Sequence, residues 1–206
     1  MIGVDASAVK PYAFGETKIM KSYTRVDLQA ALDSVSPAVK RAYEKAHELL
    51  RDHGIPHVLI GGLAVNAYGH HYSTHDVDFL VAQKDAFDGA FVLTHKLGVP
   101  FKVGGINIDY LPVETESFPP AIKDALNKII AETRKTVEKV AVIPDWLLVW
   151  TKLHIGRAKD QGAIVELIHN GLDVDSVLVE LNRIGDEHVL GLFTRCIDIA
   201  NKEEGG

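Results

Sequence analysis

Cysteine is nearly absent from this chain of 206 residues, which contains only Cys196. One thiol cannot form a disulfide within the chain, and it cannot supply a zinc site that needs several cysteines. Long apolar runs are absent as well, and no signal peptide is recognisable in the first residues. These absences exclude a disulfide scaffold, and we expect a cytoplasmic protein that makes no contact with a membrane.

Positive charge is not in excess either. The sequence has 22 Lys and Arg residues against 28 Asp and Glu residues, which gives a formal net charge of −6. This balance argues against a protein that coats nucleic acid through a wide basic face, although it is compatible with a local basic pocket. The composition, 47% hydrophobic and 24% charged, is typical of a globular protein long enough to bury a core.

Periodicity divides the chain into three parts. Residues 1–35 have weak periodicity and scattered glycine and proline, and we interpret them as an N-terminal extension of uncertain structure. Residues 36–143 mix helical and strand patterns, which predicts an α/β (α+β) core with a small mixed sheet flanked by helices. Residues 144–206 are helical, with breaks near Gly171 and Gly185, and we expect them to pack on the core.

The core begins with clear helix and strand signals. Ser36 is a favourable helix cap, Pro37 suits the first helical position, and Gly54 ends the helix. Residues 57–60 then form a short buried strand. The stretch GGLAVNAYGHHYSTHDVDFLV, residues 61–81, follows it and opens with a glycine pair and a helix of about two turns.

Two aspartates at the end of that stretch share one face of a predicted strand. In HDVDFLV, Asp76 and Asp78 alternate with apolar residues, and side chains in a strand have a period of two. A later segment, GINIDYLPV, alternates in the same way and adds Asp109. Between the two segments we expect a helix over residues 84–98 and an antiparallel strand in VPFKVGG that turns tightly at its glycine pair.

Three carboxylates in one place require compensation. Two carboxylates at positions i and i+2 of a strand lie roughly 6 to 7 Å apart at the backbone. At an effective dielectric constant of about 20 they repel by on the order of 3 kcal/mol. A hard divalent cation with oxygen ligands is the natural partner of such a cluster. Mg²⁺, or Mn²⁺, held there would suit an in-line phosphoryl displacement.

The glycine pair offers a place for the phosphates that this chemistry needs. Gly61 and Gly62 stand between a predicted strand and a predicted helix. Backbone amides at a helix start bind anions, and glycine allows an anion to approach closely. A glycine pair alone indicates only a tight turn. The ordered combination of strand, glycine pair, helix, Asp-x-Asp and a third aspartate is more specific.

This order resembles the minimal nucleotidyltransferases of the DNA polymerase β superfamily, and more narrowly the toxin nucleotidyltransferases of the abortive-infection (AbiE) type. In those proteins a stretch like residues 61–81 is followed by a helix rich in lysine, arginine and Lys-Asp, here PDWLLVWTKLHIGRAKDQGAIVELI. The resemblance covers about residues 37–170. It implies a nucleoside triphosphate as substrate and an antitoxin protein as partner. The acceptor would be a hydroxyl group, and the 3′ end of an RNA (tRNA) is favoured over a protein or a small molecule.

The resemblance also implies roles for individual residues. Gly61 and Gly62 would hold the β- and γ-phosphates. Asp76 and Asp78 would bridge the metal ions, and Asp109 would bind the catalytic metal and take the proton of the acceptor. The basic helix would neutralise the triphosphate through Lys152 and Lys159, which are seven residues apart and are therefore expected on one helix face. Arg157 and Asp160 are three residues apart and are expected to form an ion pair.

Two positions depart from the family pattern. Tyr72 stands where relatives commonly have an arginine, and Ala163 stands where an acidic residue is usual. Both changes leave the three aspartates in place. They keep open a second interpretation, a non-catalytic protein that binds a nucleotide or a partner and retains the fold.

Two further enzyme classes are weaker alternatives. A histidine–aspartate metal hydrolase would use His75 with Asp76, next to His70 and His71, but that motif belongs on a helix and HDVDFLV has strand periodicity. The histidines are therefore expected in a loop at the pocket rim, where His75 would contact substrate. A glycosyltransferase with Asp-x-Asp normally needs a longer chain and gives no role to Asp109. Trp146 and Trp150, four residues apart, are expected to pack in the core.

Overall fold

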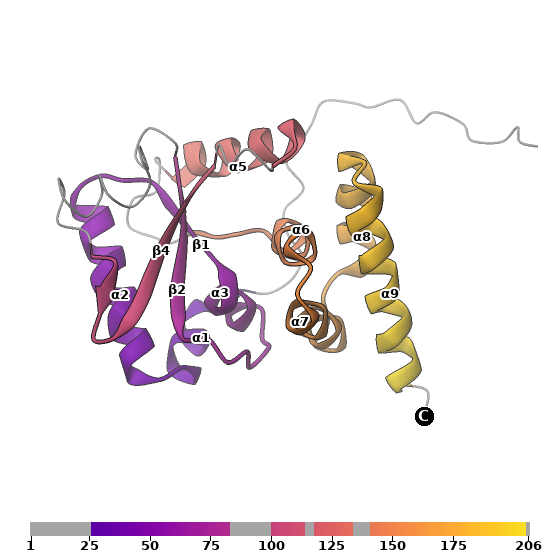
Figure 1. Ribbon diagram of the computed structural model, residues 1–206, viewed down its shortest axis with the longest axis horizontal. Helices are drawn as coiled ribbons and strands as arrows, with labels where there is room; N and C mark the ends of the chain where they lie inside the picture. The colour runs from indigo at the N-terminus through magenta and orange to yellow at the C-terminus, as the bar shows by residue number, and fades with distance from the viewer. Residues whose placement is uncertain (1–25, 83–99, 114–117, 134–140, 205–206) are drawn as a thin grey trace, which may run out of the picture.

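A five-stranded mixed sheet with helices on both faces forms the core of the protein (Figure 1). The computed structural model describes residues 26–82, 100–113, 118–133 and 141–204. The strands lie in the order β3-β4-β2-β1-β5. Their bounds are β1 His57–Ile60, β2 Asp76–Val81, β3 Lys102–Val103, β4 Ile106–Pro112 and β5 Ala141–Val142. The predicted mixed α/β class is confirmed, and the helix predicted over residues 84–98 lies outside the described residues.

The central strands have the expected alternation. Val77, Phe79 and Val81 of β2 are fully buried on one face, whereas both aspartates of β2 lie on the opposite face and are only partly covered. Strand β2 runs antiparallel to β1 and parallel to β4. Its parallel register with β4 pairs Asp78 with Asp109, so the two strands bring the predicted carboxylates side by side.

Strands β3 and β4 form the predicted hairpin. They pair antiparallel and are joined by Gly104 and Gly105, whose φ angles are +58° and +89°. Two consecutive positive φ angles are typical of the tight hairpin turn that matches strand twist, and glycine adopts them without strain. The turn thus fixes the start of β4 and the position of Asp109 along it.

Helices α2 (Pro37–Asp52) and α3 (Gly61–Ala67) cover opposite faces of the sheet. The Ser36 hydroxyl caps α2 by accepting the Val39 amide at 3.3 Å, as predicted. Tyr43 of α2 stacks on Phe79, which places α2 on the apolar face of β2. Helix α3 follows β1 directly and lies on the aspartate face, where its first residues approach Asp78.

The last residues of the expected N-terminal extension are helical. Helix α1 (Leu28–Ser34) is capped by the Asp27 carboxylate, which accepts the Ala30 amide at 2.9 Å. The Asp27 amide donates to the Ala67 carbonyl at 2.8 Å, and Ala31 is buried. This segment therefore packs on α3, beside the end of that helix (Figure 1).

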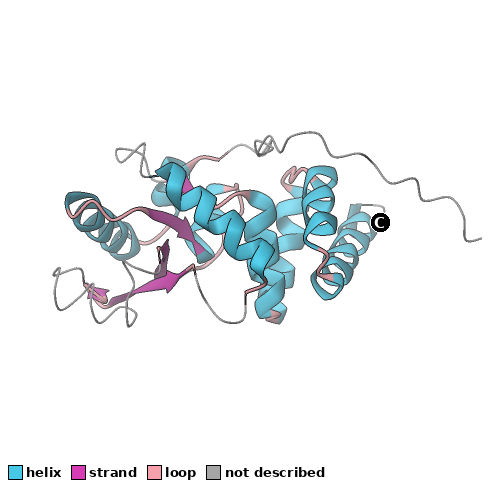
Figure 2. Ribbon diagram, turned by 90° about the horizontal axis from the view of Figure 1, so that it is seen from above, coloured by secondary structure: helices cyan, strands magenta, loops and turns pink. Residues whose placement is uncertain are grey.

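Helices α6 to α9 lie together at one side of the sheet, with α8 and α9 farther from the strands than α6 and α7 (Figure 1), and Figure 2 shows the strands toward the other end of the molecule. The bounds of the remaining helices are α5 Pro120–Thr133, α6 Asp145–Ile155, α7 Ala158–His169, α8 Val174–Ile184 and α9 Glu187–Glu204. Trp150 is fully buried, as predicted, and its Nε1 donates to Asp186 Oδ2 at 3.0 Å. Trp146 is only partly buried against the core. No described helix combines the length and apolar character that a membrane crossing requires.

A buried histidine at the start of β1 gives the fold a measurable pH dependence. His57 Nδ1 donates to the Ile55 carbonyl at 2.7 Å, so its neutral Nε2 accepts from His47 Nδ1 at 2.8 Å. Burial lowers the pKa of His57 to about 4, and only partial compensation comes from the Ile55 carbonyl. Between pH 6.5 and 4 the unfolded chain therefore binds a proton that the folded protein excludes, and stability falls as the pH falls.

We expect His57→Asn, which keeps a donor near the Ile55 carbonyl, to remove this part of the pH dependence. From pH 7 to pH 5 the wild type should lose about 2 kcal/mol more than the variant in its free energy of unfolding. Urea unfolding at several pH values measures the difference. Parallel pH profiles for the two proteins would contradict a neutral, buried His57.

Candidate active site

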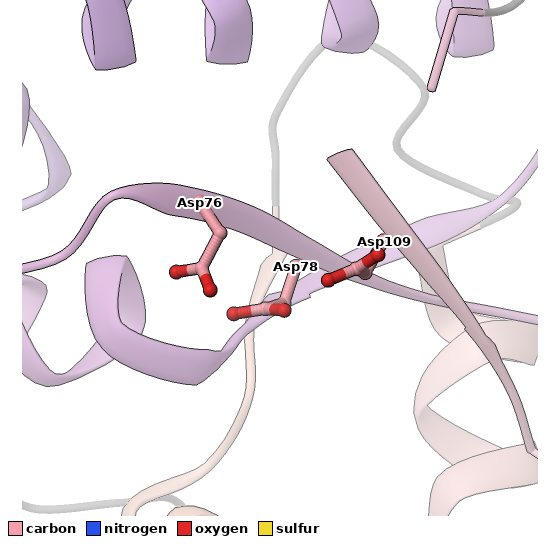
Figure 3. Close-up of side chains that lie close together, drawn as sticks. All are labelled: Asp76, Asp78 and Asp109. Carbon is pink, nitrogen blue, oxygen red and sulfur yellow. The ribbon is translucent and has the colours of Figure 1, made fainter. Parts of the chain in front are cut away.

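Three carboxylates converge on the aspartate face of the sheet. Asp76, Asp78 and Asp109 each offer an oxygen atom, and these atoms lie within 4.8 Å of one another. Figure 3 shows the side chains of β2 and β4 approaching a common point. The juxtaposition predicted from the alternation is therefore present, because parallel pairing of β2 with β4 sets Asp78 opposite Asp109.

Asp78 is partly buried in this cluster, and its pKa is raised. Its burial, together with the charges of Asp76 and Asp109, raises the pKa of Asp78 to about 6. The ammonium group of Lys152 and the backbone amide of Gly62, which donates to the carboxylate, oppose this shift. The ionised cluster is thus held at a free-energy cost that a cation can offset.

The glycine pair is required by close packing against this cluster. Gly61 has a φ of +70°, and a Cβ atom there would overlap the Asp78 carboxylate. A Cβ atom on Gly62 would lie 2.6 Å from Thr74 Oγ1. Glycine at both positions therefore lets the turn after β1 lie directly against β2, with the Gly62 amide on Asp78.

Thr74 is a supporting residue that the sequence did not single out. It is buried, and its Oγ1 donates to Asp76 Oδ1 at 2.8 Å. The same hydroxyl packs against the space beside Gly62. The signal in the sequence is a threonine two residues before the first aspartate, which suits a side chain that orients a carboxylate at the strand start.

The basic wall of the site differs from the prediction. Lys152 and Lys159 do not share a helix face, because Gly156 ends α6 in the left-handed region at a φ of +73° and Arg157 caps α7 in an extended conformation. The expected Arg157–Asp160 ion pair is also wrong. Asp160 instead accepts from Lys152 Nζ at 2.9 Å, and both side chains are buried.

Every residue predicted to bind the metal ions or the nucleotide lines one pocket with a volume of about 500 Å³, whereas His75, which was expected to contact substrate, is not among the lining residues. The aspartates and glycines come from the sheet and α3, and the basic residues come from α6, α7 and their junction. The pocket is lined by Ile60, Gly61, Gly62, Tyr72, Asp76, Asp78, Phe101, Asp109, Tyr110, Leu111, Phe118, Thr151, Lys152, Ile155, Arg157, Lys159 and Asp160. One wall is therefore anionic and the other is cationic.

The apolar and aromatic lining residues were not predicted. Phe101 is 45% exposed and Ile155 is 56% exposed, and both open onto the pocket. In the sequence, Tyr72 departs from the pattern of the nucleotidyltransferases that the chain resembles, but its position there predicts no role. These residues line one pocket only in the folded chain, since they come from the bend before β3, from α6 and from the loop before β2.

The histidines near Asp76 do not form a metal site with it. They lie in the loop between α3 and β2, and β2 begins as a strand at Asp76. Among the described residues, the pocket is lined by Tyr72 from this loop and by none of its three histidines. The helix that a histidine–aspartate hydrolase needs is thus not present at this position.

The donor set fits a hard divalent cation. All three groups are carboxylates, the oxygen ligands that Mg²⁺ and Mn²⁺ prefer. Burial and the charges of Asp76 and Asp109 raise the pKa of Asp78, and a cation bound between the carboxylates would offset that repulsion. Asp76, Asp78 and Asp109 are therefore the residues that would hold such an ion.

In comparisons with known proteins, no family model, no curated protein and no solved structure matches the chain, so its assignment depends on the geometry of the pocket.

Proposed function

We propose that this protein is a metal-dependent nucleotidyltransferase, which moves a nucleoside monophosphate from a nucleoside triphosphate to an acceptor hydroxyl. One observation carries the proposal: an anionic wall of three convergent carboxylates faces a wall of lysine and arginine side chains across a single pocket. A magnesium triphosphate carries charges of both signs and complements both walls. The sheet, with carboxylates on β2 and β4, is compatible with the fold of the polymerase β superfamily.

The carboxylates would hold the divalent cation and the acceptor. Bound there, Mg²⁺ or Mn²⁺ supplies charge stabilisation for the in-line displacement at the α-phosphorus. In that displacement the acceptor oxygen forms a bond to phosphorus, the α–β phosphoanhydride bond breaks, and pyrophosphate leaves. Asp109 is the most exposed of the three carboxylates, so it is best placed to take the proton of the acceptor hydroxyl.

The opposite wall would bind the phosphates. Lys152, Arg157 and Lys159 line it, and their charge favours the β- and γ-phosphates and the departing pyrophosphate. Because Gly61 and Gly62 have no side chains, only their backbone atoms lie between the two walls. The triphosphate would therefore extend from the carboxylates toward α6 and α7.

For the acceptor we propose the 3′ end of an RNA, as the resemblance implies. Because the chain is acidic overall, RNA must bind through the pocket and its basic wall. Such binding releases counterions, so the affinity should fall steeply with salt. Equal RNA affinity at low and high salt would contradict an RNA acceptor.

Transfer of a labelled nucleotide tests the proposal directly. The wild type and Asp76→Ala are incubated with each α-labelled nucleoside triphosphate, Mg²⁺ or Mn²⁺, and a mixture of cellular RNA and protein. We expect label in one macromolecular band with the wild type and none with the variant, whose loss of one carboxylate relieves repulsion and leaves the core intact. Equal labelling by both proteins would end the carboxylate mechanism, and triphosphate binding without transfer would favour the non-catalytic alternative.

A further inference from the structure

Tyr72 stands between the two walls of the pocket and has no role in the function proposed above. Its backbone amide donates to Asn66 Oδ1 at 2.6 Å and to the His70 carbonyl at 2.8 Å, and Asn66 is itself buried. A Cβ atom on Gly62 would lie 3.1 Å from Tyr72 Cδ1. The ring is therefore held against the glycine turn, and it faces the pocket.

Two lysines from different helices approach this ring. Lys152 Nζ lies 4.8 Å from the ring centroid, and Lys159 Nζ lies 5.6 Å from it. The Tyr72 hydroxyl is 3.5 Å from Asp160 Oδ1, the same oxygen that accepts from Lys152. Tyr72 thus contacts both partners of the buried ion pair and the exposed lysine beside it.

Lys159 depends on the ring more than Lys152 does. Lys152 has a buried carboxylate partner in Asp160. Lys159 is exposed, and within the described ranges no carboxylate lies at ion-pair distance from its ammonium group. Two ammonium groups near each other repel, and the negative face of an aromatic ring attracts both. A neutral ring at position 72 therefore attracts both ammonium groups and adds no positive charge of its own.

We propose that Tyr72 is a positioning residue that holds Lys152 and Lys159 together as a preformed site for a polyphosphate. The inference rests on the proposed function and assigns binding of the triphosphate group of the substrate to this lysine pair. The site binds the β- and γ-phosphates through charge, so it accepts a polyphosphate chain that carries no base or sugar. Tyr72 itself makes no contact with the reacting atoms in this arrangement.

Inorganic tripolyphosphate with Mg²⁺ is the probe, because it does not require the base to be known. Calorimetric titration of the full chain compares the wild type with Tyr72→Phe and Tyr72→Leu. We expect Tyr72→Phe, which keeps the ring, to bind within about twofold of the wild type, and Tyr72→Leu to bind about tenfold more weakly. If Tyr72→Leu does not fold, Tyr72→Met replaces it as the non-aromatic variant.

A double variant separates positioning from general packing. In the wild-type background Lys159→Met should weaken tripolyphosphate binding severalfold. In the Tyr72→Leu background the same substitution should change binding little, because without the ring Lys159 is no longer held in the binding site. In transfer assays Tyr72→Leu should raise KM for the triphosphate and leave kcat nearly unchanged.

Independent, additive losses, or tight binding by Tyr72→Leu, would overturn the inference and leave the proposed function standing. A wild type that binds no tripolyphosphate would also overturn the inference, and transfer of labelled nucleotide by the same protein would then decide whether the proposed function stands.

Discussion

Replacing Asp78 with asparagine is expected to abolish metal-dependent transfer and, in the same protein, to raise the free energy of unfolding at pH 8 by about 3 kcal/mol. The first effect follows because a neutral amide is a poorer partner for a divalent cation than a carboxylate. The second follows because burial and the neighbouring aspartates raise the pKa of Asp78 to about 6 in the fold, from an ordinary value of 3.8.

The sign of the pH dependence follows from these two values. Above about pH 6 the Asp78 carboxylate is ionised in both the folded and the unfolded chain, and the folded protein bears the whole cost of the buried charge. As the pH falls from 6 to 4, the folded protein takes up its proton first and the cost disappears. The stabilisation of Asp78→Asn over the wild type should therefore be largest at pH 8 and should vanish near pH 4.

Urea unfolding in the presence of a chelator measures this stability difference, and transfer of labelled nucleotide measures the activity. Asp109→Asn is the matched control, because Asp109 belongs to the same cluster but is exposed. It should lose activity without a comparable gain in stability. If metal-free Asp78→Asn is less stable than the wild type at pH 8, the ionised Asp78 carboxylate does not lower the free energy of unfolding, which would contradict this prediction.

This coupling gives the aspartate cluster a physical signature. A structural network of charges stabilises the protein that contains it, whereas a binding site is often less stable than it would be with neutral residues. Here the glycine turn packs directly against the Asp78 carboxylate, where a Cβ atom on Gly61 would overlap it. The same packing keeps the oxygen atoms of the three aspartates within reach of a common ion.

The sheet and its carboxylates could be predicted because they depend on local rules. Alternation in residues 76–81 and 106–111 assigns the faces of β2 and β4, and the Gly104–Gly105 turn assigns the hairpin. Ser36 and Pro37 likewise mark the start of α2. In each case the residues that determine the structure are neighbours along the chain.

The basic wall could not be predicted in detail because it depends on tertiary contacts. A single glycine in a helical pattern is often tolerated, so the left-handed Gly156 that separates α6 from α7 has only a weak local signal. Once the helix ends there, Lys152 meets Asp160 across two helices. Tyr72 is held by the side chain of Asn66, six residues earlier, and its ring lies near Lys152 and Lys159, about 80 residues later in the chain.

Lys152→Met is expected to destabilise the protein by about 3 to 5 kcal/mol and to weaken triphosphate binding. The ammonium group is the ion-pair partner of Asp160, which is 1% exposed, and its removal leaves a buried carboxylate without a compensating charge. It also removes the cation that lowers the pKa of Asp78, so the ionised cluster becomes more costly. Thermal or urea unfolding and titration with magnesium tripolyphosphate measure the two effects.

The double variant Lys152→Met/Asp160→Leu distinguishes the structural role of the lysine from its role in binding. Replacing both members of a buried ion pair with apolar residues removes the uncompensated charge, so most of the lost stability should return. Triphosphate binding should not return, because the positive charge is still missing from the pocket. Lys159→Met is the control on the exposed side, with a change in stability within about 0.5 kcal/mol. Recovery of both properties in the double variant would mean that Lys152 serves the fold alone, and the cationic wall would then be reduced to Arg157 and Lys159.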